Sequence, residues 1–146
     1  LKDIIDDAFI ITGSLDSRKG RELQENNRVA LNFWWSVTER QVRIQGVATR
    51  ISEGLASKYF NERNIYSKAV STICNQGEVT NNPDLLEQKV ISIVSENQFI
   101  GKPKNWGGIS INPVRIEFMQ FKDTRFHDRK LYELLAGKWT MKMLQP

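Results

Sequence analysis

The chain has 146 residues, of which 40% are hydrophobic and 26% charged, with 21 Lys and Arg against 17 Asp and Glu. These proportions are typical of a globular domain and exclude a disordered chain, and every apolar run is shorter than the roughly 20 residues of a membrane-spanning helix. The formal net charge of +4 favours anionic partners, either phosphate-bearing ligands or nucleic acid, although an ordinary solvated surface explains it equally well.

A single cysteine, Cys74, and a single histidine, His127, limit the available chemistry. No internal disulfide can form, which fits a reducing compartment, and we expect an intracellular, cytoplasmic protein. One Cys and one His cannot form a zinc site of the usual kind, so a metal-free protein is expected. The charged residues near the start predict no signal peptide, and the first residue, Leu1, suggests that further residues precede it in the natural protein.

Alternating patterns in the first third of the chain predict strands around one helix. The elements expected there are a strand over 8–12, a turn over 13–16, a helix to about Asn26, and strands over 28–36 and 40–51. In the last strand Val42 and Ile44 share one face, whereas the apolar positions from Val47 onward run one residue out of step. Gly46 lies at the slip, so we predict a β-bulge there.

The rest of the chain predicts helices followed by strands. Helices are expected over 52–63, 66–74 and 83–97, strands around 109–111 and 116–118, and a hairpin of strands 127–132 and 138–144 around Ala136-Gly137. About seven strands with the helices grouped in the middle argue against a doubly wound parallel sheet. We therefore predict one mainly β domain over 1–146, an antiparallel β-barrel with helical insertions.

The tetrapeptide Ser17-Arg18-Lys19-Gly20 falls at the predicted strand–turn–helix junction. The first turn of a helix points free N–H groups and a partial positive charge at an anion, and Arg18 and Lys19 add two cationic donors. Cations in a first turn oppose the helix dipole, so an anion bound beside them would explain their position. A solvated basic turn is the alternative, and the spacing of a P-loop is absent.

Two further segments place polar side chains on predicted strand faces. In Arg40-Gln41-Val42-Arg43 the alternation puts Gln41 on the face opposite Val42, where its amide could bond to the edge of a flavin ring. In Arg125-Phe126-His127-Asp128-Arg129 it puts Arg125, His127 and Arg129 on one face, which suits a phosphate or another oxyanion. His127 could also position or transfer a proton near neutral pH. An exposed strand face and a structural histidine are the alternatives.

Taken in order along the chain, these motifs resemble the pyridoxine/pyridoxamine 5′-phosphate oxidase family. The segments that carry the resemblance are 17–23, 40–46, Tyr59-Phe60 with Arg63, Trp106-Gly107-Gly108, 116–118 and 125–129. The resemblance implies an FMN-binding split β-barrel that works as a homodimer, with its active sites at the subunit interface. The implied reaction oxidises pyridoxamine or pyridoxine 5′-phosphate to pyridoxal 5′-phosphate through the flavin, which O2 reoxidises with release of H2O2.

The resemblance also implies roles for residues of this sequence. Arg18 and Lys19 would hold the FMN phosphate. The other implied FMN contacts are Thr12, Gly13, Gln41, Gln76, Gly77, Met119 and Arg129. The implied substrate-binding residues, mostly at the substrate phosphate, are Lys2, Tyr59, Arg63 and Ser67, and Arg125 and His127 would close over the pyridine as the catalytic pair.

The sequence departs from the family pattern at five places. Gly13 and Gly77 stand where the family usually has Thr and Ser, and Met119 replaces a Trp that contacts the flavin. The segment around Leu1-Lys2 lacks an FMN-binding arginine and a strand, and the stretch after Ser67 differs.

Two alternatives to the oxidase follow from these observations. The first is a diverged or truncated paralogue that keeps the fold and the dimer but binds flavin or pyridoxal phosphate without turnover. The second is a basic β-barrel that binds nucleic acid, for which Trp34 and Trp35 near Arg28 and Arg40 are the only indication. Under the oxidase hypothesis neither nucleic acid nor a membrane is a partner.

Overall fold

The computed structural model describes residues 1–96 and 99–146, so the predicted helix end at Asn97 lies outside the described residues. The elements in chain order are β1 (Asp3–Ile5), β2 (Ala8–Ser14), α1 (Arg18–Glu25), β3 (Arg28–Trp35), β4 (Arg40–Arg50), α2 (Glu53–Asn61), α3 (Ile65–Ile73), α4 (Pro83–Ser95), β5 (Trp106–Gln120), β6 (Asp128–Leu135) and β7 (Lys138–Leu144). The strands around one short helix and the three helices of the middle segment agree with the sequence prediction.

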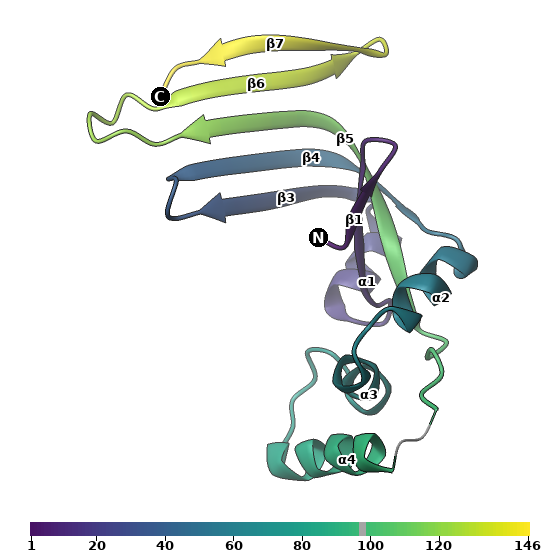
Figure 1. The fold of residues 1–146 in the computed structure, drawn as a ribbon. Coiled ribbons are helices and arrows are strands. Elements are labelled where there is room, and N and C mark those ends of the chain that lie inside the picture. Colours follow the sequence, from purple (N-terminus) through teal and green to yellow (C-terminus); the bar gives the residue numbers. More distant parts are fainter. Residues whose placement is uncertain (97–98) are drawn as a thin grey trace.

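One antiparallel sheet holds the seven strands of the described chain, and β5 is its spine. β4 pairs along one edge of β5 from Ile109 to Gln120. The other edge is divided, because β2 pairs with residues 106–111 and β6 with residues 115–120. Figure 1 shows β5 bending between a group of long strands and a second part that runs down toward the helices. The predicted mainly β class with antiparallel strands and inserted helices is confirmed.

The predicted bulge at Gly46 is present, but its extra residue lies on the neighbouring strand. Gln45 pairs with Arg115 and Gly46 pairs with Pro113, so Val114 of β5 is the unpaired residue. β4 therefore keeps its phase, and the prediction that Val47 continues the apolar face is wrong: Val47 is 37% exposed. A Cβ on Gly46 would lie 2.5 Å from the carbonyl oxygen of Asn112, so the close approach of β5 requires glycine there.

The C-terminal third differs from the prediction in two ways. The two short strands expected around 109–111 and 116–118 are one continuous strand, β5, which also includes the Trp106-Gly107-Gly108 segment that we placed before it. The strand predicted to begin at His127 begins at Asp128. The hairpin turn at Ala136-Gly137 is confirmed, with φ values of 49° and 76° at its two residues.

The structure adds a short N-terminal hairpin that the sequence analysis did not predict. β1 pairs with the start of β2, with Ile5 opposite Ala8. The two-residue turn between them, Asp6-Asp7, has positive φ at both positions, which aspartate tolerates better than most residues. This hairpin brings Lys2 and Asp3 beside α2.

Helix α2 is fixed against the start of β5 by aromatic packing. The Ser52 side chain caps the helix by accepting a hydrogen bond from the Leu55 N–H. Tyr59 and Phe60 are 2% and 0% exposed, and the Phe60 ring packs edge-to-face on Trp106 with centroids 5.1 Å apart. The polar groups of Tyr59 and of the residues that follow α2 are thereby held in one place.

The end of the sheet formed by β3 to β7 exposes apolar side chains. Its register sets Phe118 opposite Val42 and Lys130, and Tyr132 opposite Met141. The apolar face, as we call it, consists of Trp35, Phe118, Tyr132, Trp139, Met141 and Met143. Five of these side chains, all except Tyr132, are 43% to 59% exposed. A contiguous apolar area of this kind marks an interaction surface.

Candidate active site

The N-terminus of α1 forms the first group of predicted site residues. Ser17 caps the helix by accepting a hydrogen bond from the Gly20 N–H at 3.3 Å, and the first turn contains no acidic residue. Arg18 is largely exposed and pairs with Glu22 at 2.8 Å. Lys19 lines a shallow hollow together with Thr12 and Gly13 at the end of β2. Two cationic side chains therefore accompany free helix N–H groups, as the sequence predicted.

A loop residue from the middle of the chain joins this group. A Cβ placed on Gly13 would lie 3.6 Å from Oε1 of Gln76, and apart from the chain neighbours of Gly13 no other heavy atom of the described residues lies within 4 Å. Gln76 is followed by Gly77, which has a φ of 87°. The structure thus brings Thr12, Gly13 and Gln76 together, although Gly13 and Gln76 are 63 positions apart in the sequence. The open space above Gly13 leaves room for a ligand.

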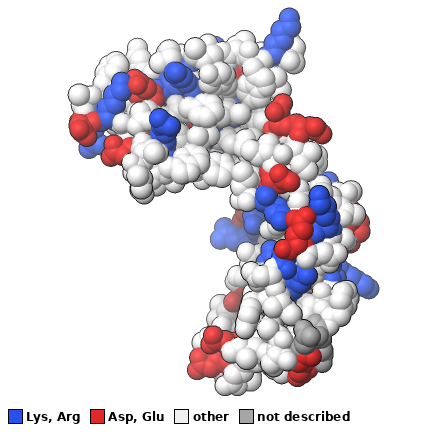
Figure 2. Space-filling model, viewed as in Figure 1, with Lys and Arg blue, Asp and Glu red and all other residues white. Residues whose placement is uncertain are grey.

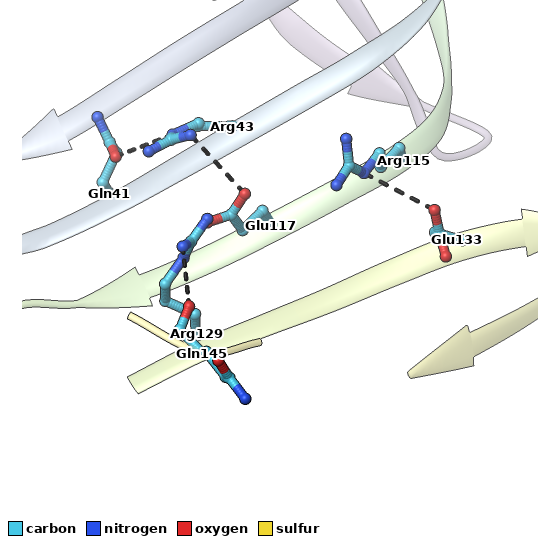
Figure 3. Close-up of polar contacts among 7 residues, drawn as sticks. All are labelled: Gln41, Arg43, Arg115, Glu117, Arg129, Glu133 and Gln145. Atoms are coloured by element: carbon cyan, nitrogen blue, oxygen red, sulfur yellow. Dashed lines mark hydrogen bonds and ion pairs between the residues drawn. The ribbon is translucent and has the colours of Figure 1, made fainter. Parts of the chain in front are cut away.

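The second group lies on the polar face of the sheet, opposite the apolar face. Gln41 of β4, Met119 of β5 and Arg129 of β6 are direct neighbours in the register. Figure 3 shows how buried Glu117 holds this face together. Its Oε1 accepts a hydrogen bond from Arg129 Nε at 2.8 Å, and Arg43 donates from Nε to Gln41 Oε1 at 3.1 Å. Met119 is only 8% exposed.

Glu117 is expected to stabilise the polar face strongly, because it is 6% exposed and pairs with Arg129. Replacing it by Gln leaves the guanidinium partly buried without its counter-charge, so we expect the free energy of unfolding to fall by about 2–3 kcal/mol. Glu133→Gln is the matched control, since Glu133 pairs with the exposed Lys142 and should cost less than about 1 kcal/mol. Urea denaturation of both variants measures the difference, and equal losses would contradict the structural role of Glu117.

The two groups lie at opposite ends of β5. Thr12 pairs with Gly108 near the start of β5, whereas Gln41 pairs with Met119 near its end. Eleven residues of strand separate Gly108 from Met119, a contour length of about 36 Å at roughly 3.3 Å per residue. Figure 1 shows the bend of β5 between the two ends. The contour length is an upper limit because the strand bends, and the register places the two groups near opposite ends of β5.

The predicted substrate-binding residues form a third group beside α2. Lys2 Nζ lies 5.0 Å from the centre of the Tyr59 ring and 2.8 Å from Glu62 Oε2. Arg63 donates from Nη2 to the Ser67 carbonyl at 3.4 Å, and its guanidinium lies over the Trp106 ring at 5.4 Å. The Nε of Arg63 is buried and has no hydrogen-bond partner among the described residues. An unsatisfied buried donor of this kind is suited to an anionic oxygen.

Tyr59 donates a hydrogen bond from its hydroxyl to Asp3 Oδ2 at 2.8 Å. Burial, together with this bond, raises the pKa of Tyr59 to about 12, and the bond lowers the pKa of Asp3. The phenol pKa lies above the unfolded value of about 10. The neutral phenol therefore contributes stability that is complete below pH 10 and is lost as the pH rises through about 12.

This pKa predicts a late component in the alkaline titration of the protein. Tyr59 should ionise near pH 12, above the usual phenol value of about 10. We therefore expect Tyr59→Phe to remove a part of the tyrosinate absorbance that appears near pH 12 in the unchanged protein. If the absorbance removed by Tyr59→Phe appears near about pH 10 instead, the Asp3–Tyr59 hydrogen bond is contradicted.

Arg125 and His127, the predicted catalytic pair, lie in a loop and not in the strand that the sequence suggested. Arg125 has a φ of 65°, and its backbone N–H donates to the Lys122 carbonyl in a turn. His127 accepts a hydrogen bond at Nδ1 from the Lys122 N–H at 3.1 Å and packs on Phe121 with ring centroids 4.6 Å apart. Strand alternation therefore does not place Arg125, His127 and Arg129 on one face. The Lys122 N–H occupies Nδ1, which leaves Nε2 as the nitrogen for a ligand.

A broad hollow of about 760 Å³ opens near this end of the sheet. Its lining combines aromatic residues of the apolar face with Gln41 and Met119; the aromatic members are Trp35, Phe118 and Tyr132. The sequence analysis missed the acidic residues that pair within two of the three groups: Asp3 and Glu62 beside α2, and Glu117 on the polar face. Glu117 could have been noticed as a charge in an apolar strand, whereas nothing in the sequence indicates that Asp3 meets Tyr59, 56 positions away.

Comparison with known families gives matches in both parts of the chain. Residues 3–95 match the family described as pyridoxamine 5′-phosphate oxidase, and residues 106–146 match the pyridoxine 5′-phosphate oxidase C-terminal dimerisation region. The pyridoxine/pyridoxamine 5′-phosphate oxidase of Trichormus variabilis is 40% identical over 149 positions, covering 100% of this chain and 70% of that protein. The chain belongs to the pyridoxamine 5′-phosphate oxidase family. The protein of the same name from Flavobacterium psychrophilum is 37% identical, with the same coverage.

Solved structures agree with membership of the pyridoxamine 5′-phosphate oxidase family. PhzG from Burkholderia lata, in complex with tetrahydrophenazine-1-carboxylic acid, superposes with a TM-score of 0.91 and 26% identity over 99% of this chain and 71% of that one. A pyridoxamine 5′-phosphate oxidase-related, FMN binding protein from Nostoc punctiforme has the same fold, with a TM-score of 0.78 at 14% identity over 99% of this chain and 76% of that one. The family supports FMN as the cofactor, as predicted.

The structure of this chain also bears on the expectations about metal ions and membranes. No group of three or more His, Cys, Asp or Glu side chains that could hold a metal ion occurs among residues 1–96 and 99–146. No helix in this described part of the chain has the length and apolar character needed to cross a bilayer.

Proposed function

We propose that the protein oxidises pyridoxamine or pyridoxine 5′-phosphate to pyridoxal 5′-phosphate with bound FMN and O2. The observation that carries the proposal is the presence of three separate groups of polar residues. The groups at α1 and on the polar face would suit the phosphate and the ring of FMN, and the group beside α2 would suit the phosphate of a pyridine substrate. When bound, FMN supplies the hydride acceptor, and the protein supplies position and electrostatics.

The residues at the start of α1 fit the phosphate end of FMN. Arg18, Lys19 and the free N–H groups of α1 would hold the phosphate, and Thr12 and Gly13 would approach the flavin with backbone. Gln76 and Gly77 would contact the flavin from the loop after α3. Gly13 fits this role because, among the described residues beyond its chain neighbours, Gln76 alone lies near the place of its missing side chain.

The residues on the polar face would contact the flavin from a second subunit. Gln41, Met119 and Arg129 lie near the end of β5, and Thr12 and Gly13 lie beside its start, so we assign the two groups to different subunits at each FMN. The C-terminal match to a dimerisation region and the exposed apolar face support a homodimer in which each chain completes its partner's site. Two equivalent sites would then lie between the subunits.

The group beside α2 would hold the substrate. Arg63, with its unpaired Nε, would bind the substrate phosphate together with Lys2, Tyr59 and Ser67. Arg125 and His127, on the loop before β6, would close over the pyridine. His127 would then hold or transfer a proton at Nε2, because Nδ1 accepts the Lys122 N–H.

An anaerobic spectrum tests the reaction. FMN is added to the purified protein, excess flavin is removed by desalting, and pyridoxamine 5′-phosphate is added under nitrogen. We expect the flavin bands to be retained after desalting and to bleach when pyridoxamine 5′-phosphate is added. When air is admitted, the bands should return and H2O2 should be released. Retained bands that do not bleach would instead favour a paralogue without turnover.

Subunit complementation tests the shared site. We expect Arg18→Ala/Lys19→Ala and Arg125→Ala/His127→Ala each to be inactive alone. When the two variants are co-expressed, each mixed dimer has one site with no substitution, so about a quarter of all sites should regain activity. Turnover of the isolated mixed dimer measures this, and a mixed dimer as inactive as either parent would show that both residue pairs act within one chain.

A substrate with a carboxylate in place of the phosphate is the second candidate. The PhzG structure holds tetrahydrophenazine-1-carboxylic acid, and the cations Lys2 and Arg63 of the α2 group could bind a carboxylate as well as a phosphate. The nucleic-acid alternative receives no support, because Figure 2 shows basic and acidic side chains interspersed over the region of α1 and α2 on the face drawn.

A further inference from the structure

The polar face also carries an exposed tryptophan, Trp34, which is not among the residues proposed above to bind FMN. Trp34 of β3 pairs with Gln41 of β4 in the register, and Gln41 pairs in turn with Met119 of β5. Met119 pairs with Arg129 of β6, so the four side chains form one row across the sheet. Paired residues of antiparallel strands lie on the same face. The indole of Trp34 therefore lies beside the three residues assigned to the flavin ring.

Trp34 is held in place by a neighbouring ring and is still 49% exposed. Phe121, directly after β5, packs edge-to-face on Trp34 with ring centroids 5.0 Å apart and an interplanar angle of 79°. Phe121 also packs on His127, with centroids 4.6 Å apart. The indole is thus fixed near the loop of the predicted catalytic pair. It presents a rigid, flat and largely apolar surface to a ligand.

The neighbours of Trp34 in this row suit the polar edge of a flavin ring. Arg43 donates from Nε to Gln41 Oε1 at 3.1 Å, so the Gln41 amide keeps its NH2 group for an acceptor. Glu117 Oε1 lies 2.8 Å from Nη2 of Arg129 and fixes this cation on the same face (Figure 3). A flavin ring combines carbonyl acceptors along one edge with a flat aromatic surface. The row offers donors for the edge and an indole for the surface.

We propose that Trp34 is a further FMN-binding residue, whose indole contacts the isoalloxazine ring of the flavin that Gln41 and Arg129 hold. This inference rests on the proposed function of the polar face. Contact between the two flat rings is favourable because both bury apolar surface. The contact involves only the ring, so it contributes equally to the binding of FMN and of riboflavin, which lacks the phosphate.

The test measures the dissociation constants of FMN and of riboflavin by titrating flavin fluorescence with the purified protein. We expect Trp34→Leu to raise both constants by about tenfold, the order of affinity that an aromatic side chain contributes against a flat ring. Trp34→Phe keeps an aromatic ring and should raise both constants less than about threefold. Phe99→Leu is the control, because it removes a ring that is 94% exposed and lies outside the three groups; both constants should stay within about twofold.

Gln41→Ala/Arg129→Ala separates this inference from the proposed function. If this double variant weakens the binding of both flavins while Trp34→Leu does not, the polar face binds the flavin ring but Trp34 is not part of the site. If neither variant changes flavin binding, the polar face is not the flavin site and that part of the proposed function is wrong. An effect of Trp34→Leu on FMN but not on riboflavin, or an equal effect of Phe99→Leu, would also overturn the inference.

Discussion

Replacing both Arg18 and Lys19 by Ala should raise the dissociation constant of FMN by about 100-fold or more. Each charge-assisted contact to a phosphate contributes roughly 1.5–3 kcal/mol. Arg18 is exposed and is shared with Glu22, so the lower value applies to each residue, and the sum of about 3 kcal/mol corresponds to about two orders of magnitude. Titration of FMN fluorescence with the purified protein measures the constant.

The control variant makes the same change in net charge at other places on the protein surface. Lys89→Ala/Lys104→Ala removes two exposed lysines outside the first turn of α1 and should leave the FMN affinity within twofold. Unchanged FMN binding in Arg18→Ala/Lys19→Ala would exclude the N-terminus of α1 as the phosphate site. Equal losses in both double variants would show a general effect of charge.

Replacing Arg125 and His127 by Ala should abolish turnover and spare FMN. Loss of a positioned acid or base typically lowers the rate 10²–10⁴-fold, and loss of the Arg125 guanidinium should weaken substrate binding as well. We therefore expect a fall of about 10³-fold or more in the rate of flavin bleaching by pyridoxamine 5′-phosphate under nitrogen. The FMN dissociation constant should stay within about twofold, because neither residue belongs to the α1 group.

Phe126→Ala provides the matched control in the same loop. Phe126 is 69% exposed and lies between the two residues, so a general disturbance of the loop would affect this variant too. We expect it to retain most of the turnover. Loss of FMN in Arg125→Ala/His127→Ala would mean that these two residues belong to the cofactor site and not to the substrate site.

The sequence predicted the local features because short-range patterns determine them. The cap and the two cations at Ser17, Arg18 and Lys19 were identified from residue type and spacing alone, and the structure places them at the first turn of α1. A bulge at Gly46 was predicted from the apolar pattern and is present, although β4 itself keeps its phase. Its extra residue was assigned to the wrong strand, because a bulge is a property of a pair of strands and one strand's pattern does not show which partner carries it.

At the loop before β6, the prediction from strand alternation was wrong within the candidate site itself. Residues 125–129 have a sequence compatible with alternation, yet the positive φ of Arg125 and the Lys122–His127 hydrogen bond turn the chain before Asp128. That turn depends on contacts with the end of β5, where His127 packs on Phe121. The strand propensity of these five residues does not reveal a turn that depends on contacts with another part of the chain.

By itself the sequence determined the mainly β class, the order of strands and helices from Ala8 to Ser95, the cationic start of α1 and the resemblance to a family that the comparisons confirm. Only the tertiary structure decided which polar residues meet: Asp3 with Tyr59, Glu62 with Lys2, and Glu117 with Arg129. It also placed the two predicted FMN groups at opposite ends of β5. The physical reason is that helix and strand patterns repeat over a few residues, whereas these contacts depend on how distant segments pack and on the length of the strand between them.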